Sequence, residues 1–155
     1  MDEHSREPHV KELRSEVDID APAERVWDVL TDFSSYPEWN PFIKSIDGEA
    51  REGAKLTVRL EPPGGRGMTF KPTVQTADAP REFRWLGRLL LPRLFDGEHI
   101  FELEATYDGG TRLVQREEFR GVLVSPLLRW VGKSTQRGFE EMNVALKGRA
   151  EAAAN

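Results

Sequence analysis

The sequence predicts an α+β domain in which a curved antiparallel sheet of about seven strands surrounds a long C-terminal helix. Two short helices are expected after the first strand. Period-two alternation of apolar and charged residues recurs between glycine- and proline-rich turns, which is typical of strands with one buried face. Helical spacing appears in a short segment near residue 25 and in a long one after residue 125. Because one helix cannot fill a wide concave sheet, space is expected between them.

The composition limits the classes of function. The 155 residues fit a single domain over 1–155, with 1–8 and 152–155 expected as flexible tails. A net charge of −5 without a basic stripe argues against nucleic-acid binding. The absence of cysteine excludes a disulfide framework and thiolate metal sites. No ligand triad at metal spacing occurs, so neither a metal nor a cofactor is expected.

The N-terminal segment and the hydropathy indicate a cytoplasmic protein. The stretch MDEHSREPHVKELRSE is charged and has no apolar core, so no signal peptide is expected. No apolar run approaches membrane-spanning length, so we expect no integral membrane association. The oligomeric state is not predicted by the sequence.

The first strand and the two short helices come from the first quarter of the chain. Residues 10–20 alternate as a half-buried strand, and APAERVWDVLTDFSSYPEWNPF follows over 21–42. Prolines at 37 and 41 limit helix length here, because a residue before proline avoids the α region. We expect a short helix, a tight break and a second short segment that forms an aromatic lid. The lid residues are Tyr36, Trp39 and Phe42.

Shorter strands are expected at residues 43–49, 54–61, 68–77 and 83–89. The glycine-rich stretch 61–67 reads as a hairpin loop, because it lacks the lysine and the helix of a phosphate-binding loop. Pro72 cannot donate to a strand ladder and therefore suggests an edge or a bulge. Gly87 shares a face with Trp85, which leaves space beside the indole ring.

The clearest hairpin joins strands at residues 95–107 and 111–122. Their less charged faces match if odd-numbered residues pair with odd-numbered residues. A three-residue loop, 108–110, meets this condition and provides glycine for a left-handed position. This loop predicts Phe101 opposite Glu117 and His99 opposite Phe119, with Glu118 facing solvent.

The last element is a helix from Ser125 to about residue 150, with serine as N-cap and Pro126 at the first helical position. Spacings of three and four residues predict a buried apolar stripe. The stripe comprises Leu128, Val131, Thr135, Phe139, Met142 and Leu146.

This order of elements resembles the START-like (SRPBCC) helix-grip superfamily, with APAERVWDVLTDFSSYPEWNPF early and an amphipathic helix late. The segments FRWLGRLLLPRLFDGEHIFELE and GGTRLVQREEFRGVL resemble a bacterial polyketide cyclase/dehydratase-like branch. The resemblance spans residues 10–150. It implies a helix-grip fold with a deep apolar cavity for a hydrophobic small molecule. Because fold does not determine function, cyclases, lipid carriers and co-chaperone-like proteins all remain open.

Three inward-facing polar residues, His99, Gln115 and Glu117, are the candidates for chemistry. A histidine and a carboxyl group in a cavity can act as general acid and base, orient a ligand, or form a structural hydrogen bond. The structural hydrogen bond is favoured here over the two functional roles. The predicted ligand-binding residues are Trp39, Phe70, Trp85, His99, Phe101, Gln115, Glu117, Phe119, Phe139 and Met142.

The leading functional hypothesis is therefore a carrier or sequestering protein for an apolar ligand such as a lipid, polyketide or aromatic metabolite. The first alternative is a metal-free polyketide cyclase/dehydratase using His99 and Glu117 as acid and base. The second is a co-chaperone-like interaction module. That module needs an exposed apolar patch, and the charged outer faces of the strands offer none.

Overall fold

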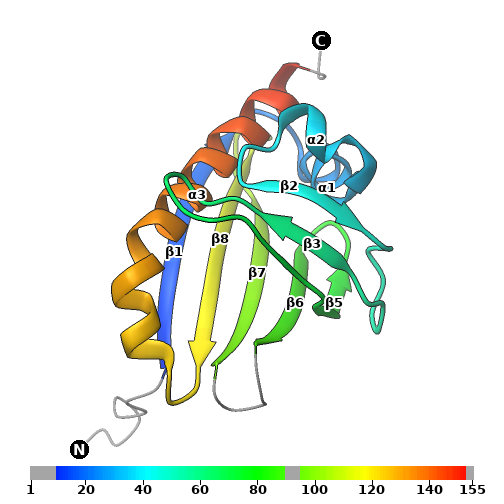
Figure 1. Cartoon of the computed structure of the whole chain (residues 1–155). Helices are drawn as coiled ribbons and strands as arrows, with labels where there is room; N and C mark the ends of the chain where they lie inside the picture. The colour runs from blue at the N-terminus through cyan, green and yellow to red at the C-terminus, as the bar shows by residue number, and fades with distance from the viewer. Residues whose placement is uncertain (1–9, 90–94, 153–155) are drawn as a thin grey trace, which may run out of the picture.

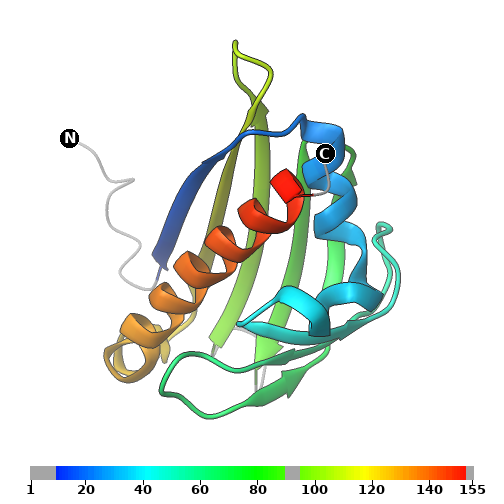
Figure 2. The same ribbon diagram turned by 90° about the horizontal axis from the view of Figure 1, so that it is seen from above.

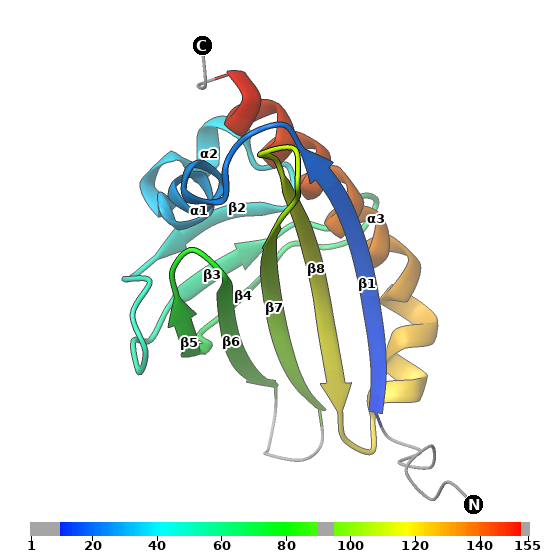
Figure 3. The ribbon, with the colours of Figure 1, turned by 180° about the vertical axis from the view of Figure 1, so that it is seen from behind.

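The computed structural model describes residues 10–89 and 95–152, and it has the predicted α+β helix-grip architecture. A five-stranded antiparallel sheet has the order β1-β8-β7-β6-β5, and β2, β3 and β4 form a second sheet. Figure 1 shows β2 and β3 running across the direction of the longer strands. Figure 3 shows β1, β8, β7 and β6 side by side from behind. The elements are β1 (Val10–Ile19), α1 (Ala23–Thr31), a 3₁₀ turn (Phe33–Ser35), α2 (Tyr36–Trp39), β2 (Ile43–Asp47), β3 (Thr57–Leu60), β4 (Met68–Phe70), β5 (Thr73–Asp78), β6 (Glu82–Leu89), β7 (Phe95–Ala105), β8 (Thr111–Arg120) and α3 (Val124–Ala152).

The expected single strand over residues 68–77 is wrong, and this difference gives two sheets instead of one continuous sheet of about seven strands. The strand is interrupted at Lys71 and Pro72. The part before them, β4, pairs with β3, and the part after them, β5, pairs with β6. Pro72 has no N–H for a ladder, but its carbonyl accepts a hydrogen bond from the Leu56 amide at 2.9 Å. The proline therefore marks the point where the chain passes from one sheet to the other.

The predicted hairpin has the right inner face and the wrong register. His99 lies opposite Glu117, and Phe101 lies opposite Gln115. The last pair is Ala105 with Thr111, so five residues connect the strands, not three. Both loop lengths preserve the pairing of odd with odd residues, which is why the face was correct although the partners shifted by two.

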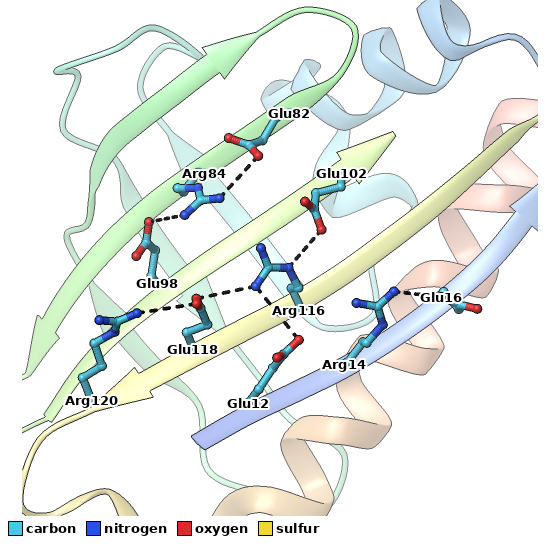
Figure 4. Close-up of polar contacts among 10 residues, drawn as sticks. All are labelled: Glu12, Arg14, Glu16, Glu82, Arg84, Glu98, Glu102, Arg116, Glu118 and Arg120. Atoms are coloured by element: carbon cyan, nitrogen blue, oxygen red, sulfur yellow. Dashed lines mark hydrogen bonds and ion pairs between the residues drawn. The ribbon is translucent and has the colours of Figure 1, made fainter. Parts of the chain in front are cut away.

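The outer face of the five-stranded sheet carries charged side chains that pair across strands (Figure 4). Arg116 contacts Glu102 at 2.9 Å and Glu118 at 3.5 Å, and Arg84 contacts Glu98 at 2.9 Å. Desolvation lowers the pKa of Arg116, but the hydrogen bond to Glu102 and the surrounding carboxylates raise it overall. Glu118 therefore faces outward, as predicted.

The core lies between the concave face of the sheet and the C-terminal half of α3. Aromatic rings from several elements fill it, and the rings of Phe83 and Phe101 are stacked with centroids 6.4 Å apart. The Phe42 ring lies 5.6 Å from that of Phe139. Gly138 allows this approach, since an added Cβ atom there would overlap the Phe42 ring. The expected aromatic lid is thus partly core, because Tyr36 and Phe42 are fully buried.

The long helix is buried along only half of its predicted stripe. Figure 2 shows α3 crossing the concave face obliquely, so its C-terminal half lies over the core. Phe139, Met142 and Leu146 are fully buried, whereas Val131 is 44% exposed. The helix also begins at Val124, so Ser125 lies inside its first turn and is not the N-cap. Among the helices of the described residues, none is long and apolar enough to span a membrane.

Candidate ligand-binding site

An apolar cavity of about 220 Å³ opens between the sheet and the N-terminal half of α3. A broader hollow of about 570 Å³ beside Arg14, Arg81 and Glu102 is lined mainly by charged side chains and does not suit an apolar ligand. A shallow hollow of about 550 Å³ lies on the other side of α3, beside Leu13, Leu128 and Gly132. The cavity is lined by Leu60, Met68, Phe70, Gly87, Phe95, Gly97, Glu117, Phe119, Leu127, Val131 and Thr135.

Two glycines form the floor of the cavity. Gly87 of β6 and Gly97 of β7 lie directly opposite each other, so this part of the sheet has no side chains on either strand. A Cβ atom added at Gly87 would lie 3.3 Å from the Phe70 ring, and one at Gly97 would lie 2.5 Å from Glu117 Oε2. The paired glycines therefore leave the space that forms the cavity floor and that the Glu117 carboxylate occupies.

Among the described residues that line the cavity, Glu117 is the one that carries a charge. Its Oε1 atom lies 3.0 Å from His99 Nδ1, and its Oε2 atom is directed over Gly97. The Glu117 side chain is 18% exposed, whereas His99 is buried beneath it at 3%. One carboxylate oxygen is thus held by the core, and the other is available to a polar group of a ligand.

The orientation of Gln115 determines which nitrogen of His99 carries hydrogen. Gln115 Nε2 donates to Asn143 Oδ1 at 2.7 Å and lies 3.5 Å from the Phe139 carbonyl, which can only accept. Gln115 Oε1 therefore points to His99 Nε2, 2.9 Å away, and must accept a hydrogen from it. The remaining contact, between His99 Nδ1 and Glu117 Oε1 at 3.0 Å, places an imidazole nitrogen and a carboxyl group side by side at the cavity wall.

The polar chain continues through α3 to the first strand. Asn143 Nδ2 donates to Ser15 Oγ at 3.2 Å. The network therefore joins Glu117 at the cavity to β1 across the core, and a satisfied buried network of this kind fixes side-chain orientation.

Within residues 10–89 and 95–152, no group of three or more histidine, aspartate or glutamate side chains is placed to hold a metal ion.

The structure places the ten predicted ligand-binding residues in three groups. Phe70, Glu117 and Phe119 line the cavity, and His99 and Gln115 form the polar network behind Glu117. The Trp85 ring lies 4.9 Å from the His99 ring, and Trp39 packs against Tyr36 at 5.1 Å. Trp85, Phe101, Phe139 and Met142 are buried in the core away from the cavity, and the partly buried Trp39 packs against that core.

Gly97 was not predicted as a site residue. Neither were Met68, Leu127 and Val131, the lining residues that are also exposed to solvent and that we call the mouth of the cavity. Gly97 carries a recognisable signal, because it is an inward-facing glycine on a strand next to the one that contains Gly87. The mouth residues carry no such signal, since apolar residues at helical or strand spacing more often belong to the core.

Comparisons with known proteins agree with this fold. Residues 11–151 match a family model described as polyketide cyclase / dehydrase and lipid transport. The fold is similar to Zhui aromatase/cyclase from Streptomyces sp. R1128, with a TM-score of 0.77, 17% identity, and coverage of 95% of this chain and 97% of that one. A START superfamily protein from Mycobacterium smegmatis has a TM-score of 0.70 and 22% identity. The match covers 94% of this chain and 99% of that one. A norcoclaurine synthase point mutant from Thalictrum flavum, solved with a transition-state analogue, has a TM-score of 0.72 and 14% identity. The match covers 94% of this chain and 97% of that one. No curated protein matches the sequence.

Proposed function

Because the chain belongs to the polyketide cyclase / dehydrase and lipid transport family, we propose that it binds a hydrophobic small molecule in the cavity beside α3. We propose that it acts as a carrier or sequestering protein for a lipid, a polyketide or an aromatic metabolite. Family and fold support hydrophobic-ligand binding or a polyketide-cyclase type of function. The narrower choice of a carrier rests on the cavity itself.

The proposal rests on an apolar cavity wall that, within residues 10–89 and 95–152, contains one carboxylate, that of Glu117. Sites for small molecules are mostly apolar and use a few polar groups to fix orientation. The volume of about 220 Å³ is below the roughly 300–1,000 Å³ of sites that enclose drug-sized ligands. We therefore expect a compact ligand, or a longer one that extends through the mouth between Met68 and Leu127.

Replacing Gly87 with valine is expected to weaken binding of 1-naphthol, a compact aromatic alcohol, by at least about ten-fold. The valine methyl groups would project from the floor into the space now bounded by Phe70. Folding should be retained, because valine suits a strand interior better than glycine. Isothermal titration calorimetry of the purified chain measures the affinity.

The matched control is Arg88→Val, the next residue of β6, whose side chain faces outward and is 56% exposed. It adds the same side chain to the same strand without entering the cavity, so its affinity should equal that of the wild type. Equal affinity for 1-naphthol in Gly87→Val and wild type would mean that the ligand binds elsewhere.

A cyclase or dehydratase is the second candidate, and the His99–Glu117 contact of 3.0 Å favours it. Cyclisation of an aldol type requires a base that takes a proton from a carbon next to a carbonyl group, and the Glu117 oxygen directed over Gly97 is the group at the cavity wall that would accept it. The two functions differ in the Glu117→Gln variant. Loss of turnover of a poly-β-ketone with retained affinity would assign catalysis, whereas no turnover by wild type would leave the carrier function.

A further inference from the structure

The N-terminal half of α3 exposes large apolar side chains to solvent. Trp130 is 88% exposed, Val131 44% and Leu127 39%. Positions 127, 130 and 131 are three and four residues apart, so these side chains lie together on one side of the helix. Val122, just before the helix, is 56% exposed. We call Leu127, Trp130 and Val131 the α3 apolar face. The helical spacing had predicted Val131 in the buried stripe.

The charged residues of the chain segment that carries this face are all basic, although the chain as a whole has a net charge of −5 and Glu117 lies in the cavity that Leu127 and Val131 line. Between Glu118 and Glu140 the charged residues are Arg120, Arg129, Lys133 and Arg137. The last three are exposed on α3: Arg129 lies between Leu127 and Trp130, and Lys133 and Arg137 follow within the next two turns.

These basic side chains differ from those of the sheet. On the outer face of the sheet, each arginine drawn in Figure 4 is paired with a glutamate. Arg129, Lys133 and Arg137, by contrast, take part in none of the ion pairs formed within residues 10–89 and 95–152. Their charge is therefore free to attract an anionic surface.

We propose that the α3 apolar face and its basic residues bind the surface of a membrane that contains anionic lipid. An amphipathic helix with Trp and Leu on one side and Lys and Arg beside them lies in the interfacial plane of a bilayer. Tryptophan suits the headgroup region, and each basic residue near the surface adds attraction to anionic lipid.

A membrane fits this surface better than a protein partner does. A stable protein interface buries about 800 Å² on each partner, more than three apolar side chains on one helix provide. In a two-fold dimer a second copy would present the same face of α3, and the basic residues of the two copies would repel one another. A uniformly anionic lipid surface complements a group of basic residues that contains no acid.

The position of this face relates it to the cavity. Leu127 and Val131 belong both to the apolar face and to the cavity lining, and Met68 lines the opposite side of the mouth. A bound membrane would therefore cover the mouth, and a hydrophobic ligand would pass between bilayer and cavity without crossing water. The inference goes beyond ligand binding and does not depend on it, because membrane binding is measured without a ligand.

The test is co-sedimentation of the full chain with phosphatidylglycerol vesicles and, separately, with phosphatidylcholine vesicles. We expect binding to phosphatidylglycerol that weakens as salt is added, and far weaker binding to phosphatidylcholine. Trp130→Ala should reduce the affinity for phosphatidylglycerol vesicles at least about ten-fold, since it removes the most exposed large ring. Lys133→Gln should reduce it about five-fold.

Matched controls lie away from α3. Tyr107→Ala removes a fully exposed aromatic ring from the loop between β7 and β8, and Lys55→Gln removes an exposed lysine before β3. Both variants should bind vesicles as the wild type does. Circular dichroism of each variant confirms that it is folded.

Three results would overturn the inference: no binding to phosphatidylglycerol, equal binding to both lipids, or unchanged binding in Trp130→Ala. A dimer in sedimentation velocity that Trp130→Ala abolishes, without vesicle binding, would assign the face to a second copy. Calorimetry with 1-naphthol separates this from ligand binding, because Trp130 does not line the cavity and its variant should bind 1-naphthol normally.

Discussion

Replacing Phe139 with alanine is expected to lower the free energy of unfolding by about 3–5 kcal/mol. The side chain is fully buried, and its ring lies 5.6 Å from the Phe42 ring and 5.1 Å from the His99 ring. These neighbours belong to different elements and are held by their own contacts, so they cannot collapse into the space left by the ring. Urea denaturation followed by circular dichroism measures the loss.

The control for this substitution is Val144→Ala on the same helix. Val144 is 66% exposed, so its replacement should change the free energy of unfolding by no more than about 0.5 kcal/mol. Phe139 also lies outside the cavity lining, so the folded fraction of Phe139→Ala should bind 1-naphthol nearly as well as the wild type. Similar small losses in both variants would show that α3 does not pack on the core through Phe139.

Replacing Glu117 with leucine is expected to lower the affinity for 1-naphthol by about ten- to a hundred-fold. The affinity for naphthalene, which has the same shape without the hydroxyl group, should not change. A hydrogen bond to a charged group contributes roughly 1.5–3 kcal/mol, which corresponds to this range of affinity. Glu117 Oε2 is the carboxylate oxygen directed over Gly97, away from the Oε1 contact with His99. Calorimetric titration of both compounds against both proteins gives the comparison.

Glu118→Leu is the matched control, because it removes a carboxylate from the next residue of β8 on the outer face. It should bind both compounds as the wild type does. Leucine at 117 also leaves His99 Nδ1 without its partner, so some stability is lost, and affinities are compared at temperatures where each variant is folded. Equal binding of 1-naphthol by wild type and Glu117→Leu would make Glu117 a structural residue only.

The order of elements and the inner faces of the strands were predictable, because alternation records which side of a strand is buried. Register was not, since shifting a partner by two residues leaves every side chain on the same face. The choice between Phe101 and His99 as the partner of Glu117 depended on whether the loop contains three or five residues. Both lengths suit the glycines there, and Gly109 does take a positive φ of 88°.

The candidate site was less predictable than the fold, for the same reason. The opposition of Gly87 and Gly97 and the His99–Glu117 contact both depend on register. Trp85 and Phe139 share their pattern with cavity residues, and only packing shows that they fill the core. In α3 the spacing that buries Phe139 also exposes Val131, because the helix leaves the core halfway along its length.

We propose above that a compact hydrophobic ligand occupies the cavity between the glycine floor and the N-terminal half of α3. The most direct measurement is methyl NMR of the chain saturated with 1-naphthol, observing nuclear Overhauser effects between ligand protons and side-chain methyl groups. Effects to Met68, Leu127 and Val131, with none to the exposed Val144 farther along α3, are predicted. Effects confined to methyl groups outside the cavity lining would contradict the claim.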